Sequence, residues 1–270
     1  MTIQSNRRDI LKGGLAAAGL GILGIPEWAL PALAQGETLV PFTDIDDPLT
    51  LVRSPERRII DIRTIPENGQ FTPADQFATT QHYGHPVIDP ASYRLRVSGL
   101  VDQALSLSID DLRAMPSREI VIGFECSGNR GPLNGLSGNG RWTGVPLRTV
   151  LDRAGVKADA KEFVFFGADH GEEVVEFRGR PYTVDQQYGR SLAREKALSS
   201  EPILVYALNG EPLTRHQGFP LRLLVPGWYG MALVKWLAEI HVQEDRYLGK
   251  FQARHYRTLK GEMVNGEMKW

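Results

Sequence analysis

Cys126 is the residue around which chemistry could be built, because it is the only cysteine in a chain of 270 residues. It follows an apolar run at 120–124, and a small, glycine-rich turn that carries Arg130 comes next. This pattern predicts a strand that leads into a tight turn, with the thiol at the strand end, where loops build sites. A thiolate is a nucleophile or a soft metal ligand, and a nearby arginine favours the ionised form. Most free cysteines are buried small hydrophobes, so the surrounding sequence must decide between the two roles.

The composition limits which chemistry is open to this thiol. With 42% hydrophobic residues, the chain can bury the core of one large domain. Its net charge of −1 gives no electrostatic case for nucleic acid or an anionic membrane. One cysteine excludes an internal disulfide, a four-cysteine metal site and c-type haem attachment, which needs two. A redox centre must therefore be a cofactor that is held by one thiolate or by none.

The N-terminus predicts an export signal at 1–34. The segment SNRRDILK at 5–12 resembles a twin-arginine motif, and an apolar, glycine-rich run at 13–25 is too short to span a membrane. Ala32 and Ala34 fit the small-x-small cleavage rule. We therefore expect a periplasmic protein without a membrane span in its mature form. The twin-arginine route carries folded proteins, often with a cofactor already bound. The signal therefore indicates a protein that binds a cofactor.

Strands dominate the predicted elements of the mature chain, and helices are few and short. Residues 35–76 read as an extended arm, 77–256 as the main domain, and 257–270 as a tail. Apolar and alternating runs predict strands at 92–97, 119–125, 162–166, 173–177, 203–208, 221–225 and 233–242. Short helices are expected at 109–115 after Ser108 and from Pro146 to Gly155, with a partly helical segment at 183–198 and a loop from 127 to 144. This order predicts an α+β fold with mixed sheets.

Several common sites can be excluded from the spacing of residues. The segment GLSGN at 135–139 fails the nucleophile-elbow pattern at its fifth position, and GNG at 138–140 lacks the third glycine of a dinucleotide loop. His82 and His85 have the spacing of a metal pair, yet two histidines in such a loop are more often surface groups.

Six segments in a fixed order carry a family resemblance. They are FECSGNR at 124–130, RWTGVPL at 141–147, NGEPL at 209–213, GFPLR at 218–222, VPG at 225–227 and VKWL at 234–237. Together they resemble the molybdopterin-binding core of the sulfite oxidase family over about residues 77–256. The resemblance implies a molybdenum–molybdopterin cofactor, with Cys126 as the protein's ligand to the metal. Soft sulfur ligands suit such a metal.

The same resemblance implies which residues bind the cofactor and the substrate. Those implied for the cofactor are Thr80, Gln81, His82, Cys126, Asp169, Gln217, Arg222, Leu233, Val234 and Lys235. Those implied for the substrate pocket are Arg130 for an oxyanion, Tyr188 for the reacting oxygen and Trp142 as a wall. Arg222 and Lys235 suit a phosphate, because guanidinium chelates and ammonium adds point charge.

Three departures from the family pattern bear on substrate and length. Thr80 stands where sulfite oxidases have an arginine in an F-x-x-R-x-H stretch. Gln217 stands where they have a histidine before G-F-P, and it is similar to the sulfane dehydrogenase branch. Family members usually continue into an immunoglobulin-like dimerisation domain, which would begin near 249–252. The segment 257–270 is therefore either a tail or the start of that domain, and the chain either a fragment or a monomeric variant.

The expected activity is oxidation of a small sulfur oxyanion, sulfite first, with electrons passed to a separate c-type cytochrome. Three alternatives remain open at this point. The same cofactor could reduce sulfoxides, or the protein could bind anions through Arg130 and Arg141 without a cofactor. A cysteine hydrolase would use Cys126 with His82 or His170 as its base.

Overall fold

The computed structural model describes residues 71–74, 77–129, 135–257 and 261–269. The predicted export signal, Arg130 and most of the predicted arm lie outside these residues. None of the helices in the described ranges is both long and apolar enough to cross a membrane.

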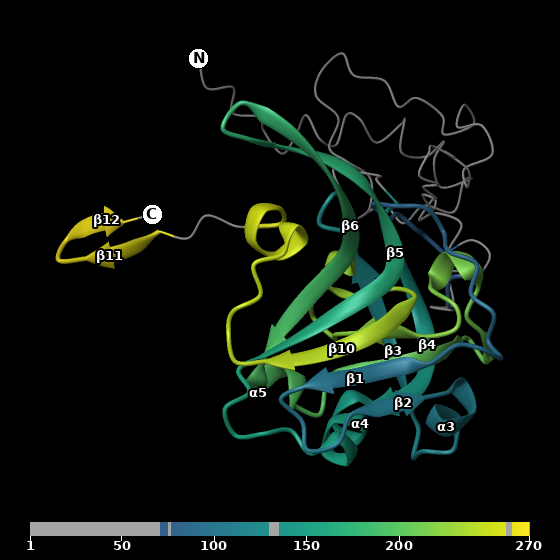
Figure 1. Ribbon diagram of the computed structural model, residues 1–270. Helices are drawn as coiled ribbons and strands as arrows, with labels where there is room; N and C mark the ends of the chain where they lie inside the picture. The colour runs from purple at the N-terminus through teal and green to yellow at the C-terminus, as the bar shows by residue number, and fades with distance from the viewer. Residues whose placement is uncertain (1–70, 75–76, 130–134, 258–260, 270) are drawn as a thin grey trace, which may run out of the picture. The chain divides into compact units, whose positions relative to one another are not determined.

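Two five-stranded sheets make up most of the domain (Figure 1). The strands of the first sheet, in spatial order, are β2 (Leu105–Leu107), β1 (Leu95–Gly99), β10 (Leu237–Gln243), β5 (Glu162–Phe177) and β6 (Arg180–Ala193). Those of the second are β3 (Arg118–Glu125), β4 (Ser137–Pro146), β7 (Ile203–Leu208) and β8 (Glu211–Pro212), with β9 (Arg222–Leu224) paired to β7. Since β1 pairs with β10 in parallel and β10 pairs with β5 antiparallel, the sheet is mixed. The predicted α+β fold with mixed sheets is confirmed.

Local signals explain the two longer helices. Before α3 (Ile109–Arg113), the Ser108 hydroxyl accepts from the Asp111 backbone N–H, and the Asp111 carboxylate accepts from the Ser108 N–H. This capping box satisfies two backbone donors that the first helical turn leaves free. α4 (Leu147–Ala154) buries an apolar stripe and ends at Gly155, whose φ of 69° is easily reached only by glycine. Both helices were predicted, and α5 (Arg194–Ala197) adds one turn.

The predicted loop from 127 to 144 is wrong, because β4 occupies 137–146. Its side chains alternate in burial, and it lies between β3 and β7 in the second sheet. A Cβ added at Gly144 would lie 2.0 Å from the Leu204 carbonyl oxygen, so glycine permits the close approach of the two backbones. The glycines that suggested a loop are thus part of a tightly paired strand.

The predicted partly helical segment at 183–198 does contain one helical turn, α5, but β6 runs through most of it. β5 is one strand from Glu162 to Phe177, with an irregularity between Phe166 and His170, where two strands were expected. Near the C-terminus, 233–236 are not extended, and the short strands β11 (Glu262–Val264) and β12 (Glu267–Lys269) form a separate hairpin. Mutual pairing of β5 and β6 overrides their polar composition, which carries little strand signal.

Both sheets and α4 contribute to one apolar core. Leu95 and Phe163 from the first sheet, Leu204 from the second and Leu147 from α4 belong to the same buried cluster. Each fully buried side chain of this size stabilises the fold by roughly 1.5–3 kcal/mol. This shared core fixes the end of β3, the bulge of β5 and the segments around β9 relative to one another. These segments form the site.

Candidate functional site

One cavity gathers residues that are distant in sequence. Its lining comprises Ala78, Thr79, Thr80, Gln81, His82, Phe124, Cys126, Leu136, Asp169, Tyr188, Gln217, Arg222, Gly230, Met231, Leu233, Lys235, Trp236 and Tyr256. A concave lining that combines apolar side chains with a few convergent polar and charged groups is typical of a site for a small molecule or cofactor.

Cys126 lies directly after β3, as predicted, and its half-buried thiol lines the cavity. The Gly128 backbone N–H points at its sulfur, with nitrogen and sulfur 3.4 Å apart. The turn is held by the Asn129 side chain, which donates to the Glu125 carboxylate at 2.7 Å and accepts from the Leu136 N–H at 3.1 Å. These contacts fix the turn so that the sulfur, a soft ligand for a metal, is held at the cavity.

Two cations are buried in the wall opposite polar, uncharged groups. The Lys235 ammonium donates to the Thr79 hydroxyl at 2.8 Å and to the His216 carbonyl at 3.1 Å. Arg222 is 2% exposed and donates to the Gln217 side chain at 2.9 Å. Burial lowers the pKa of Lys235 to about 7, with the Arg222 charge as a second cause, and lowers that of Arg222 to about 9. Two buried cations are costly, and the Asp169 carboxylate acts only on Lys235, so an anion would stabilise this wall.

The arginine packs against two neighbouring aromatic rings, whose centroids lie 6.0 Å apart. Its guanidinium carbon lies 5.3 Å from the ring centroids of both Phe124 and Trp142. Trp142 is fully buried and does not line the cavity; it lies behind this wall and donates its indole N–H to the Ile122 carbonyl at 3.3 Å. The predicted wall residue therefore contacts the cavity only through Arg222 and Phe124.

Asp169 supplies a buried carboxylate at the bulge of β5. The residue is 4% exposed, and among the described residues its Oδ1 atom has no hydrogen-bond partner. Burial raises its pKa to about 6, although the nearby Lys235 charge acts in the opposite direction. Arg222 Nε is likewise buried without a partner in the described part of the chain. Orphaned buried donors and acceptors of this kind indicate polar groups of a ligand as their partners.

An aromatic wall closes another side of the cavity. The His82 ring stacks on Tyr188, with centroids 5.0 Å apart, and packs on Phe251 at 4.3 Å. Burial, together with nearby positive groups, lowers the pKa of His82 to about 4, so the ring is neutral at pH 7. Its Nε2 atom lies 2.5 Å from the Tyr256 hydroxyl. The Tyr188 hydroxyl instead donates to the Met231 carbonyl.

Most residues implied by the resemblance lie together. Those that line the cavity are Thr80, Gln81, His82, Cys126, Asp169, Tyr188, Gln217, Arg222, Leu233 and Lys235. Val234 is fully buried and outside the lining, and Arg130 lies outside the described residues. Of the groups named for the alternative functions, His82 and Cys126 line the cavity, whereas Arg141 faces Glu119 at 3.6 Å and His170 pairs with Asp185 at 2.8 Å.

Tyr256 is the residue that sequence reasoning missed. It follows η7 (Lys250–Arg254), a turn that packs Phe251 against His82 and so places Tyr256 at the cavity. Burial and the charge of Cys126 both raise the pKa of its hydroxyl. No motif in the segment HYR at 255–257 marks it. Only its position in the fold reveals it.

Comparison with known proteins agrees with this site. Residues 82–251 match a family model described as the oxidoreductase molybdopterin binding domain, which is the class that the fold and cavity define. Sulfite oxidase of Mus musculus is 31% identical over 261 residues, or 86% of this chain and 46% of that protein. Sulfite oxidase of Gallus gallus is 35% identical over 206 residues, or 69% of this chain and 42% of that protein.

A solved structure adds agreement in three dimensions. The sulfane dehydrogenase SoxCD from Paracoccus pantotrophus matches with a TM-score of 0.66 and 25% identity, over 93% of this chain and 64% of that one. The chain belongs to the sulfite oxidase family of molybdopterin-dependent oxidoreductases. It spans less than half the length of the two sulfite oxidases.

The residues present fit the molybdenum–molybdopterin cofactor of this family. One soft sulfur donor, Cys126, opens into the cavity beside polar atoms that need partners. Arg222 and Lys235 provide the positive charge that a phosphate requires, and Asp169 provides an acceptor for ring N–H groups. The cavity therefore offers matching groups to the metal end and to the phosphate end of such a cofactor.

Proposed function

We propose that this protein oxidises a small sulfur oxyanion, sulfite first, to its higher oxyanion. The balanced reaction is sulfite plus water to sulfate, two protons and two electrons. The observation that carries the proposal is the Cys126 thiol, which opens into a cavity that also holds two buried cations and a tyrosine hydroxyl. Both the metal end and the phosphate end of the family's cofactor find matching groups there.

In this proposal Cys126 holds the metal, and Arg222 and Lys235 hold the phosphate. Asp169 accepts hydrogen bonds from the pterin ring, which satisfies its orphaned Oδ1 atom. When bound, the molybdenum cofactor supplies the two-electron redox change and the exchange of an oxygen atom. The protein contributes binding, orientation and a shielded polar pocket, as it does in other cofactor enzymes.

Tyr256 takes the substrate-facing role that the resemblance implied for Tyr188. Both tyrosines line the cavity, but the Tyr188 hydroxyl already donates to the Met231 carbonyl, whereas the Tyr256 hydroxyl pairs with a neutral imidazole. If His82 donates its Nε2 proton to the Tyr256 oxygen, the phenol proton is free to point at a substrate anion. Arg130, four residues after the thiol, adds charge for the same anion in this proposal.

Thr80 leaves one position of the cavity wall uncharged. Its side chain is exposed to the cavity, where the family pattern has an arginine. Loss of a guanidinium weakens the binding of a dianion, because its fork matches two oxygens at once. We therefore expect weaker sulfite binding than in a sulfite oxidase that retains this arginine.

Location and electron acceptor are also part of the proposal. The segment SNRRDILK at 5–12 supports export to the periplasm by the twin-arginine route. Sulfite oxidation releases two electrons, and the single cysteine rules out covalent c-type haem attachment within this sequence. A separate c-type cytochrome that takes one electron at a time fits this requirement.

Metal analysis together with a steady-state assay tests the function. We expect near-stoichiometric molybdenum in the purified protein, and sulfite-dependent reduction of ferricyanide, a small one-electron acceptor. The Cys126→Ser variant is the control, because serine is a poor ligand for this metal. Molybdenum-loaded protein that reduces methionine sulfoxide and leaves sulfite unchanged would assign the site to sulfoxide reduction instead.

A further inference from the structure

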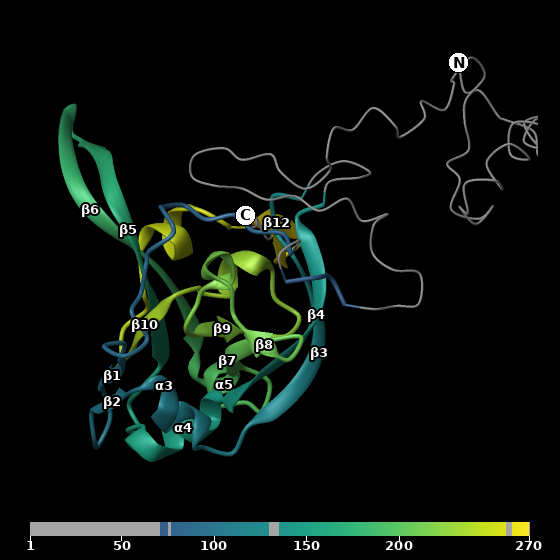
Figure 2. The same cartoon turned by 90° about the vertical axis from the view of Figure 1, so that its right-hand side faces the viewer.

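Strands β5 and β6 extend beyond the first sheet as a two-stranded ribbon (Figures 1 and 2). β10 pairs with β5 only as far as Gly167, whereas β5 and β6 remain paired out to Phe177 and Arg180. We call residues 171–186 the outer ribbon. Two strands without a third neighbour are only marginally stable in water, so a ribbon of this length requires further stabilising contacts.

The two faces of the outer ribbon differ in chemistry. Directly opposed residues of an antiparallel pair share a face. One face, here called the apolar face, carries Val175, Phe177, Tyr182 and Val184. The opposite face carries Glu172, Asp185, Val174, Thr183, Glu176 and Pro181. The ribbon is therefore apolar on one side and mainly polar and acidic on the other.

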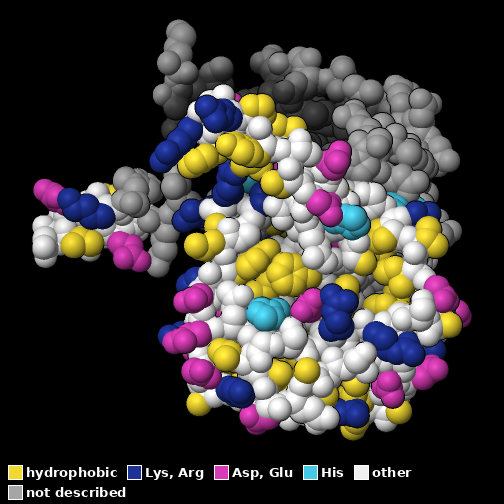
Figure 3. All heavy atoms as spheres, viewed as in Figure 1, with side chains coloured by type: hydrophobic (Ala, Val, Ile, Leu, Met, Phe, Trp, Pro, Cys, Tyr) yellow, Lys and Arg dark blue, Asp and Glu magenta, His cyan; other side chains and the backbone are white. Residues whose placement is uncertain are grey.

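Arginine borders the apolar face at its tip. Phe177 is 59% and Tyr182 49% exposed, although both are large apolar groups. Arg180 lies opposite Phe177 in the register, and the Arg178 guanidinium lies 5.1 Å from the Phe177 ring centroid. Yellow and dark blue side chains meet on this ribbon in Figure 3. Exposed aromatic residues beside arginine are typical of the residues that dominate protein interfaces.

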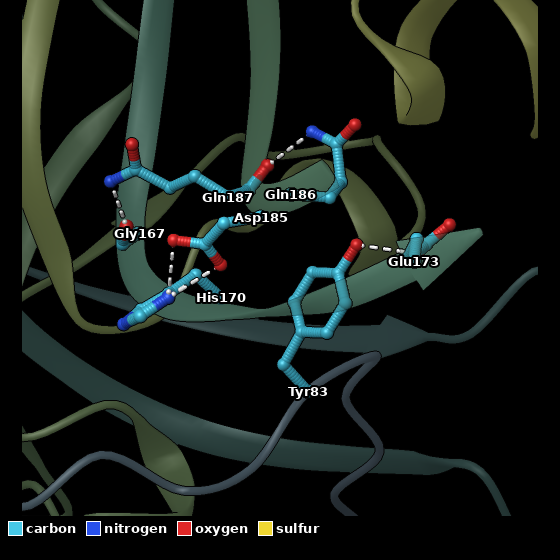
Figure 4. Close-up of polar contacts among 7 residues, drawn as sticks. All are labelled: Tyr83, Gly167, His170, Glu173, Asp185, Gln186 and Gln187. Atoms are coloured by element: carbon cyan, nitrogen blue, oxygen red, sulfur yellow. Dashed lines mark hydrogen bonds and ion pairs between the residues drawn. The ribbon is translucent and has the colours of Figure 1, made fainter. Parts of the chain in front are cut away.

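The base of the ribbon is fixed by polar contacts (Figure 4). The Gln187 amide donates to the Gly167 carbonyl at 2.6 Å, and His170 pairs with Asp185 at 2.8 Å. Tyr83 donates to the Glu173 carboxylate at 2.6 Å. These contacts tie both strands and the segment at 77–89 together at the base of the ribbon.

The apolar face also leads to the wall of the cavity. Glu173, the acidic group on this face, forms an ion pair with Lys250, the first residue of η7. The next residue, Phe251, packs on His82 and Tyr188, which line the cavity. The carboxylate is thus already neutralised, and Glu173 connects the inner end of the apolar face to the segment that packs on the cavity wall.

We propose that the apolar face of the outer ribbon is the docking surface for the one-electron carrier. Its partner is a redox protein with acidic groups around an exposed apolar cofactor edge. The inference rests on the proposed function, because each oxidised sulfite releases two electrons and two carriers must bind and leave in turn. An apolar centre with a charged rim suits such a transient contact, since complementary charge speeds encounter.

Two ribbon variants and one matched control test this surface. Phe177→Ser with Tyr182→Ser removes the apolar centre, and Arg178→Glu with Arg180→Glu reverses the rim. Val174→Ser, on the opposite face, is the control, because Val174 is 70% exposed. Each is assayed with sulfite and an acidic c-type cytochrome, then with ferricyanide, at low and high salt. Titration calorimetry measures binding of the same cytochrome directly.

We expect kcat/KM for the acidic cytochrome to fall about 30-fold or more in the serine pair, as for interface hot spots. The glutamate pair should lose the salt dependence of this rate, because the steering charges are gone. Turnover with ferricyanide and all rates of Val174→Ser should match those of the wild type.

Unchanged cytochrome kinetics in both ribbon variants would overturn the proposal. An equal loss with ferricyanide would also overturn it, since the damage would then lie in the cavity. If ultracentrifugation shows a wild-type dimer that the variants lack, a second copy is the occupant and the carrier is excluded. Should the wild type fail to oxidise sulfite with ferricyanide, the proposed function fails. The calorimetric comparison then decides the docking surface alone, because it needs no turnover.

Discussion

Replacing Tyr256 by phenylalanine removes one hydroxyl and keeps the ring that packs against His82. The Tyr256 side chain is 40% exposed, and its hydroxyl lies 2.5 Å from the His82 Nε2 atom. One such hydrogen bond contributes roughly 0.5–1.5 kcal/mol to stability, so a protein of this size should lose only a few degrees of Tm. The fold should therefore survive, and any large effect must appear in activity.

The expected loss of activity follows from the charge of the substrate. A hydrogen bond from a phenol to an anion is worth about 1.5–3 kcal/mol, and each 1.36 kcal/mol is a factor of ten. We expect kcat/KM for sulfite to fall about 10- to 150-fold in Tyr256→Phe. Stopped-flow and steady-state assays with ferricyanide, on protein of measured molybdenum content, give this ratio.

The pH dependence of the loss is also determined by the site. Burial lowers the pKa of His82 to about 4 and raises that of Tyr256, so the imidazole stays neutral and the phenol stays protonated between pH 5 and 8. The ratio of variant to wild type should therefore be constant over this range. A ratio within twofold of one would refute the assignment of Tyr256 to the substrate.

Tyr188→Phe is the matched control for this experiment. Its hydroxyl donates to the Met231 carbonyl, so the variant leaves a buried acceptor without a donor. That defect costs about 1–3 kcal/mol of stability. We expect a lower Tm and a smaller change in kcat/KM than in Tyr256→Phe. The reverse order would return the substrate-facing role to Tyr188.

Four further predictions concern other groups. Cys126→Ser should keep the wild-type circular dichroism spectrum and lose molybdenum, and wild-type turnover would make the thiol structural. Arg130→Lys should lower kcat/KM about 30- to 1000-fold, for a loss of roughly 2–4 kcal/mol, because lysine lacks the guanidinium fork; equal kinetics would exclude Arg130. Arg7→Lys with Arg8→Lys should retain the precursor in the cytoplasm, which fractionation and blotting would reveal. In cofactor-free protein the raised pKa of Asp169 should make unfolding easier as pH rises from about 4 to about 6, and urea titrations of Asp169→Asn should lack that slope.

The sign of the Asp169 prediction comes from proton counting. Its carboxyl has a pKa of about 6 in the fold and an ordinary value near 3.8 when unfolded. Between these values the folded state binds more protons, so stability falls with rising pH. Bound cofactor should reduce the effect, because ring donors then stabilise the charged carboxylate. An equal slope in both proteins would assign the titration to another group.

Local signals made several features predictable. The strand into Cys126, the cap at Ser108 and the stop at Gly155 each depend on a few neighbouring residues, and all three are present. Capping, turn glycines and apolar runs act over one turn or one strand, so they can be read without knowledge of the fold. The six family segments can likewise be recognised from the types and order of their residues alone.

Strand pairing could not be read in this way. β4 is rich in glycine, and the outer part of β6 is polar, so neither carries a strong strand signal. Each becomes a strand because a partner lies alongside, which is a tertiary property. The same reason hides the two faces of the outer ribbon, since they depend on which residues of β5 and β6 are opposed.

The sequence by itself determined the class of chemistry, because a lone thiol and two cations in family segments need no coordinates to be recognised. Tertiary structure decided how these groups are used. It placed Trp142 behind Arg222, committed the Tyr188 hydroxyl to a backbone carbonyl and brought Tyr256 to the cavity. Hydrogen bonds and ring contacts act only over a few ångströms, so residues far apart in the chain acquire their roles when the core has assembled.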